Sequence, residues 1–200
     1  MAEETEEKNQ KNSDEKPVDL LVRTLKTRRV LLSEDVNSKS ARKIIDQLFL
    51  LEQDDPDSPI YFFINSPGGE VTSGMAIYDV MEFLKPKIYT IGCGLVASIA
   101  AIIHLQPEKD ARLSLPNAEF LLHQPLGGMQ GSASDLEIHA NHILRTRTQL
   151  NDLISNKSGQ SLDEVEKSTK RDFWMTARQA LEWGLVGNII ARAEDLPGKE

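Results

Sequence analysis

The hydrophobic positions of this chain alternate between two spacings, one typical of helices and one typical of buried strands. Asn37 or Ser38 is the expected cap of a helix. After these residues the apolar side chains recur three and four positions apart, which predicts one buried face: Ala41, Ile44, Ile45, Leu48 and Phe49. Residues 60–64 form an unbroken apolar run, as expected for a strand that is covered on both faces. Further strands are predicted at residues 29–32, 88–91, 111–115, 119–122 and 186–190, and a short helix at residues 20–25.

Further helices are predicted after Gly69, Ser98, Ser132 or Ser134, Ser161 and Thr176, mostly from hydroxyl residues at capping-box spacing. Strands that alternate with helices indicate an α/β fold with a mostly parallel sheet. In such sheets, ligands bind where strands end and helix N-termini point. Gly68, Ser98 and His123 each follow a predicted strand, so we expect them to share one edge of the sheet. Residues 170–175 are expected to form a linker.

Composition narrows the possible classes of protein. Two hundred residues suit one domain, predicted at 18–193, after a polar, disordered tail at 1–17 and before a loose tail at 194–200. The net charge of −8 argues against a nucleic-acid partner. No apolar run reaches the roughly 20 residues of a membrane span, and the N-terminus is not a secretory signal. Cys93 is the only cysteine and fits a core position in a reducing, cytoplasmic setting.

Ser98 is the candidate nucleophile. The apolar strand at 88–91 is expected to run into a turn flanked by Gly92 and Gly94. A helix of small residues leaves this turn, and Ser98 lies near its start, where unpaired backbone N–H groups could hold an oxyanion. The alternative is that Ser98 only caps the helix or fills space. A serine nucleophile needs a base, and the base needs an orienting acid.

His123 is the best candidate base, because it stands at a strand end before a glycine-rich segment. His104 is expected in the core. His139 and His142 are expected on the surface of a long helix, and we expect no metal there because two histidines lack further ligands. Asp172 is the candidate acid; the alternative is a cap or a partner of Arg171.

Several sequence motifs resemble one family, the proteolytic subunits of the Clp protease, of the crotonase-like superfamily. They are Ile64-Asn65-Ser66-Pro67-Gly68-Gly69, Gly74-Met75-Ala76-Ile77-Tyr78-Asp79, Leu115-Pro116-Asn117, His123-Gln124-Pro125-Leu126-Gly127-Gly128 and Arg171-Asp172-Phe173-Trp174-Met175. The resemblance covers about residues 28–190. It implies repeated β-β-α units with a protruding handle helix, and serine endopeptidase activity on unfolded proteins.

The resemblance also implies roles for single residues. Ser98, His123 and Asp172 are the implied catalytic triad, and the backbone N–H groups of Gly69 and Ile99 form the implied oxyanion hole. Gly68, Gly127 and Gly128 are implied to bind an extended peptide through their backbones. Gln130 and Arg171 are implied to contact the opposite ring.

The implied partners follow from the same family. Its members form two stacked seven-membered rings, and an AAA+ unfoldase of the ClpX, ClpA or ClpC type feeds them substrate. The chain itself needs no cofactor, since the unfoldase uses the ATP. Three departures stand out: the acidic, polar residues 1–17, Lys170 in place of an acidic residue, and the bulky Val96 and Ile99, which are expected to narrow the pocket beside Ser98. The departures suggest a divergent subunit that needs a paralogous ring.

Two other functions remain open at this point. One is a catalytically weak regulatory or scaffold subunit, which keeps only the ring contacts. The other is an acyl-CoA enzyme of the same fold, which would use the Gly69 donor to stabilise a thioester enolate. The order Ser98, His123, Asp172 favours the peptidase, because the acyl-CoA enzymes need no such triad.

Overall fold

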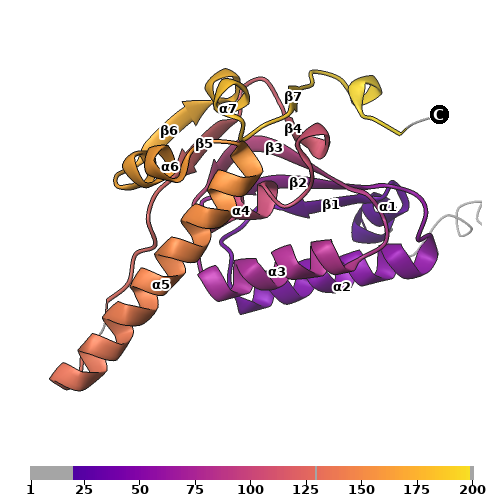
Figure 1. Cartoon of the computed structure of the whole chain (residues 1–200). Helices are drawn as coiled ribbons and strands as arrows, with labels where there is room; N and C mark the ends of the chain where they lie inside the picture. Colours follow the sequence, from indigo (N-terminus) through magenta and orange to yellow (C-terminus); the bar gives the residue numbers. More distant parts are fainter. Residues whose placement is uncertain (1–19, 129, 199–200) are drawn as a thin grey trace, which may run out of the picture.

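The computed structural model describes residues 20–128 and 130–198. Within these residues a mixed sheet has the order β1-β2-β3-β4-β7, and β5 and β6 extend it from β3 (Figure 1). The strands are β1 (Arg29–Leu32), β2 (Ile60–Ser66), β3 (Ile88–Ala97), β4 (Arg112–Ser114), β5 (Glu119–Leu122), β6 (Phe173–Thr176) and β7 (Asn188–Ile189). The helices are α1 (Leu20–Lys26), α2 (Ser38–Asp54), α3 (Val71–Phe83), α4 (Ile99–His104), α5 (Ala133–Ser158), α6 (Leu162–Thr169) and α7 (Ala177–Trp183). The expected α/β class is confirmed, and the predicted tail at 1–17 lies outside the described residues.

Helices α2, α5 and α7 each begin at a capping residue that the sequence had offered as a candidate. The Asn37 side chain accepts hydrogen bonds from the backbone N–H groups of Lys39 and Ser40 and so caps α2. Of the two candidate caps for α5, Ser132 is the one used, and Gly159 ends the helix in the left-handed conformation. Thr176 and Gln179 form a capping box at α7.

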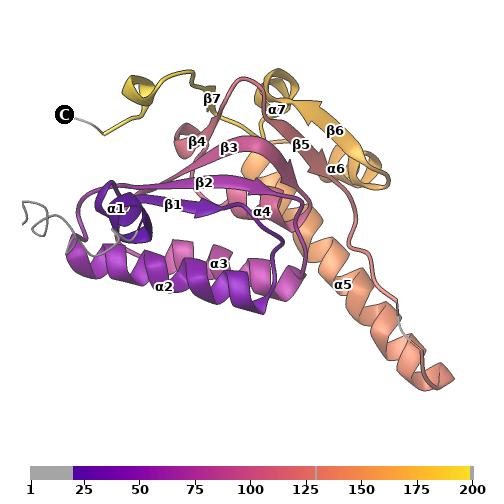
Figure 2. The same ribbon diagram turned by 180° about the vertical axis from the view of Figure 1, so that it is seen from behind.

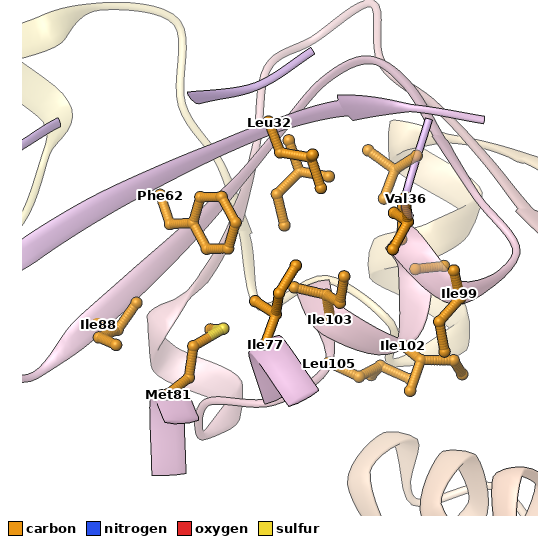
Figure 3. Packing of buried hydrophobic residues seen from close by; sticks show 14 of the residues in the cluster. Leu32, Val36, Phe62, Ile77, Met81, Ile88, Ile99, Ile102, Ile103 and Leu105 are labelled. Carbon is orange, nitrogen blue, oxygen red and sulfur yellow. The ribbon is translucent and has the colours of Figure 1, made fainter. Parts of the chain in front are cut away.

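The main core lies between the sheet and helices α2, α3 and α4. Figure 3 shows Leu32 and Phe62 of the sheet above Ile77 of α3 and Ile103 of α4. These four side chains are at most 1% exposed. Helix α4 therefore starts inside the core, which holds its first residues against the sheet.

Strand β3 is longer than the predicted strand at 88–91, because it continues through the glycines to Ala97. Its first half pairs with β4 and its second half pairs with β5. Between the halves, Ile64 pairs with Gly92 and Ser66 with Val96, so a single residue of β2 faces three residues of β3. This bulge was not predicted, since glycines at 92 and 94 suggested a turn.

Two further predictions were wrong. Residues 173–176, most of which fall in the predicted linker, form strand β6, antiparallel to β5, because Met175 packs in the core opposite Phe120. The tail from residue 194 is not loose up to Gly198: Leu196 is buried, and the Tyr61 hydroxyl donates to the Pro197 carbonyl at 2.6 Å.

Helix α5 projects away from the rest of the fold, as the view from behind shows (Figure 2). Its outer half carries exposed apolar side chains at Leu136, Ile138 and Leu144. None of the helices in the described part of the chain combines the length and the apolar character that crossing a membrane requires. The projecting helix matches the expected handle.

His104 gives the fold a predicted pH dependence. Its ring is fully buried, with Nε2 2.9 Å from the Leu113 carbonyl, and burial lowers its pKa from 6.5 to about 4. The folded state therefore holds a neutral ring over a pH range in which the unfolded chain binds a proton. The contribution of His104 to stability is fully present above pH 6.5 and is lost as the pH falls towards 4.

Urea unfolding at several pH values between 7 and 4 measures this loss of stability, with His104→Gln as the comparison. The variant is expected to lose less stability over the same pH range, whatever its stability at pH 7. If both proteins lose stability equally as the pH falls, His104 is not the cause of the pH dependence.

Candidate active site

Ser98 sits at the sharp turn from β3 into α4. Its backbone has φ 57° and ψ −127°, a conformation that non-glycine residues rarely adopt. The Ser98 N–H donates to the Leu121 carbonyl of β5 at 2.8 Å, which fixes the turn against the neighbouring strand. Ser98 occupies the N-cap position, but its hydroxyl makes no capping hydrogen bond. The hydroxyl is therefore not used as a helix cap, and the strained backbone points to a functional constraint.

The sheet registers bring the three triad candidates to one edge. The parallel pairing of β3 with β5 ends at Ala97 and Leu121, so Ser98 lies next to Leu122 and one residue from His123. The antiparallel pairing of β5 with β6 ends at Leu122 and Phe173, so His123 and Asp172 are the first residues beyond the paired ends of the two strands. Both residues thus come from adjacent strand ends, and the ladder is not continued beyond them, because the Gln124 N–H donates to the Thr169 carbonyl.

The three triad candidates line two cavities, and His123 lines both of them. Ser98 and His123 line a small, mostly apolar cavity together with Val71, Ile99, Ile102, Leu122, Pro125, Leu150, Asn151 and Ile154. His123 and Asp172 line a wider, open one with Gln124, Leu126, Lys170 and Arg171. His123 thus lies between Ser98 and Asp172. Within the described residues no hydrogen bond joins these three side chains, and catalytic hydrogen bonds often tighten only when substrate binds.

Two backbone donors lie beside Ser98. A Cβ atom at Gly68 would lie 2.7 Å from Ser98 Cβ and 3.2 Å from Ile99 N, so the Gly68–Gly69 turn touches the start of α4. The Gly68 N–H donates to the buried Ser66 hydroxyl at 3.1 Å. By contrast, the N–H groups of Gly69 and Ile99 have no acceptor within the part of the chain that the structure describes. Unused donors beside a serine hydroxyl suit a developing oxyanion.

The segment after His123 runs beside α5 (Figure 1). A Cβ atom at Gly127 would lie 2.8 Å from Ile143 Cδ1 of that helix, whereas one at Gly128 would meet open space. Gln124 anchors the start of the segment, since its N–H donates to the Thr169 carbonyl at 2.8 Å. Gln130 and Arg171 are both exposed.

Sequence reasoning misplaced one residue near the site and missed others. Val96 is fully buried and faces Gly92 and Phe120, so it does not narrow the cavity. Ile99 does line the cavity, and the absence of a side chain at Gly74 leaves room for it. Leu150 and Asn151 of α5 were not expected at the site. Leu150 belongs to the apolar face of that helix, but the direction of this face depends on how the helix packs; the polar Asn151 gave no such signal.

The remaining candidates fall outside the site. His104 is buried in the core and Cys93 is half-buried, where desolvation raises the pKa of its thiol. His139 and His142 lie on α5. Across residues 20–128 and 130–198, no three His, Cys, Asp or Glu side chains gather closely enough to hold a metal ion.

Comparison with known proteins agrees with the geometry. A family model described as "Clp protease" matches residues 12–193. The chain is 49% identical over 175 residues to "ATP-dependent Clp protease proteolytic subunit 2" of Treponema pallidum (strain Nichols), and the match covers 88% of each chain. The likeness thus includes the sheet, the Ser98 turn and the projecting helix.

Proposed function

This chain belongs to the Clp protease family, and from that premise we propose that it is a serine endopeptidase subunit with Ser98 as nucleophile. The single observation that carries the proposal is that the β3–β5 and β5–β6 ladders end directly beside Ser98, His123 and Asp172. The unpaired Gly69 and Ile99 donors beside Ser98 support it. An acyl-CoA enzyme would have no use for this alignment, and an inactive scaffold would have no need of the strained Ser98 turn.

The mechanism follows from these positions. His123 takes the proton of the Ser98 hydroxyl as its oxygen attacks a peptide carbonyl. The carbonyl oxygen becomes negative and accepts hydrogen bonds from the Gly69 and Ile99 N–H groups. His123 returns the proton to the leaving amine, and water then hydrolyses the acyl-enzyme by the reverse steps. Asp172 holds His123 in the required tautomer.

Substrate binding is assigned to backbone edges and to the apolar cavity. An extended peptide that adds between Gly68 and the Gly127–Gly128 segment would bond mainly through its main chain, with little sequence preference. The cavity lined by Val71, Ile99 and Ile102 holds only about 20 Å³, so it would take an apolar side chain of the substrate only after its lining residues move apart.

Assembly is proposed on the same basis. The exposed Leu126, Leu136 and Ile138 on and beside the projecting helix suit burial in a second copy, within stacked seven-membered rings. Gln130 and Arg171 are placed at the ring contact, and a paralogous ring is a further proposed partner. The curated relative is named as ATP-dependent, which fits a partner unfoldase that uses the ATP. A cytoplasmic site of action completes the proposal.

Digestion of an unfolded protein tests the function. The purified chain is incubated with fluorescently labelled, permanently unfolded casein, and the products are sized by mass spectrometry. Short peptides without added nucleotide are expected, because an unfolded substrate needs no unfoldase. Assembled particles that leave the casein intact, alone and with a paralogous subunit, would contradict the proposal.

Gly68→Ala is expected to reduce peptidase turnover by at least about 100-fold. The added methyl would lie 2.7 Å from both Ala97 O and Ser98 Cβ, and Gly68 has φ 93°. Gly159→Ala is the matched control, since its φ is 79° and no atom lies near the added methyl. Hydrolysis of a fluorogenic peptide and the thermal midpoint are measured for both. Equal losses of turnover would attribute the effect to backbone strain rather than to the site.

A further inference from the structure

Asn65 stands alone at the centre of the β3 bulge. It is the one residue of β2 between the pairs Ile64–Gly92 and Ser66–Val96, and it faces residues 93–95 of β3. Those three residues lack the regular partners in β2 that an unbroken ladder would give them. Their conformation must therefore be held by other contacts, because backbone amides that lose ladder partners need replacements.

The Asn65 side chain supplies the replacement. Its Oδ1 accepts the Leu95 N–H at 3.1 Å, and its Nδ2 donates to the Ser33 hydroxyl, just beyond β1, at 3.1 Å. Gly94 has φ 64°, and a Cβ atom there would lie 2.6 Å from Asn65 Oδ1, so the amide also fits tightly against the bulge. One side chain of β2 thus links β3 to the residue that follows β1.

The bulge lies where the pairing partner of β3 changes from β4 to β5. Before it, residues up to Gly92 pair with β4; from Leu95, the residue that Asn65 holds, β3 pairs with β5. Ser98 follows three residues later, with its N–H on the Leu121 carbonyl. A shift of Leu95 would therefore also displace Ser98, which is only three residues further along the strand. Bulges beside active sites commonly set the direction of side chains in this way.

We infer that Asn65 is a positioning residue, whose side-chain amide fixes the β3 bulge and thereby sets the Ser98 hydroxyl beside His123. The inference rests on the proposed role of Ser98 as nucleophile. Asn65 acts through its bond to Leu95 and touches neither reacting atom. The positioning depends on Oδ1, which accepts the Leu95 N–H. The hydrogen bond from Nδ2 to Ser33 only helps to orient the amide.

Three variants separate these contributions. Asn65→Ala removes the acceptor for Leu95; Asn65→Asp keeps an acceptor oxygen and loses the donor to Ser33; Ser33→Ala is the matched control that loses the same outer bond. The rate at which a fluorophosphonate modifies Ser98 and the kcat and KM for a peptide are measured on assembled particles. Asn65→Ala is expected to lower the modification rate and kcat together, by about 10- to 100-fold, with KM within about twofold. The other two variants should stay within about threefold of the unmodified protein.

Several results would overturn the inference. The first is an unchanged modification rate in Asn65→Ala. The second is a raised KM at constant kcat in the same variant, which would make Asn65 a substrate contact. The third is an Asn65→Asp protein that reacts as slowly as Asn65→Ala. Failure of the unmodified protein to react would instead refute the proposed function. Amide hydrogen exchange then still tests the bulge: Asn65→Ala should speed exchange at residues 95–98 and Ser33→Ala should not, and equal protection in both would refute the positioning role.

Discussion

Ser98→Ala is expected to lower peptidase turnover by about 10⁴- to 10⁶-fold while the particle still assembles. The loss follows because water must replace the bound nucleophile, and the residual rate comes from substrate binding and the Gly69 and Ile99 donors. Alanine tolerates the φ of 57° about as well as serine does, and the Ser98 hydroxyl makes no capping bond, so the fold should survive. Hydrolysis of a fluorogenic peptide measures the rate.

Size-exclusion chromatography and circular dichroism show whether the Ser98→Ala particle is intact. Ser38→Ala is the matched control, because Ser38 is exposed on α2 and does not line either cavity of the site. The control should keep full activity. A Ser98→Ala protein that retains more than about a hundredth of the turnover would exclude Ser98 as the nucleophile.

Asp172→Asn is expected to lower kcat by about 10³- to 10⁴-fold near neutral pH. Asparagine keeps the size of the side chain but donates where the carboxylate accepts, so it favours the wrong tautomer of His123. The structural basis of this expectation is that Asp172 and His123 lie directly beyond the last β5–β6 pair and line the same cavity. The measurement is kcat across neutral and alkaline pH, with Asp79→Asn on α3 as an exposed carboxylate control.

The expected pH profile separates orientation from loss of fold. Part of the lost activity should return at high pH, where hydroxide can replace the base, and the thermal midpoint should change little. Normal kcat in Asp172→Asn would remove Asp172 from the triad and leave Ser98 and His123 as a pair.

The local signals in the sequence predicted the local parts of the fold. Ser132 and Thr176 cap helices as their spacing indicated, and Asn37 is the one used of the two candidates Asn37 and Ser38, because a cap depends only on residues within one turn. The apolar run at 60–64 lies in the buried strand β2 for a similar reason. Such features require no knowledge of distant contacts.

The features that depend on distant contacts were missed. Strand β6 exists because β5 pairs with it, and its four residues carry no signal strong enough to stand alone. The β3 bulge depends on the bond between Asn65 and Leu95, which lie 30 positions apart in the sequence. No periodicity or capping pattern connects two residues at that separation, so the glycines of β3 were interpreted as a turn.

The triad candidates depend partly on local signals and partly on distant contacts. Ser98 and His123 were found because each follows an apolar strand, whereas Asp172 was found in a segment that was expected to be a linker. The β5–β6 register explains why Asp172 lies at the same strand ends as His123. The apolar cavity was missed because Leu150 and Asn151 reach it from a helix whose packing the sequence pattern does not specify.

Covalent modification of the assembled protein by a fluorophosphonate, followed by peptide mapping, tests the alignment of Ser98, His123 and Asp172 most directly. We expect one modified site, at Ser98, that is absent in Ser98→Ala and forms at least about 100-fold more slowly in His123→Ala. An assembled protein that stays unmodified, or that reacts equally fast without His123, would contradict the proposed alignment.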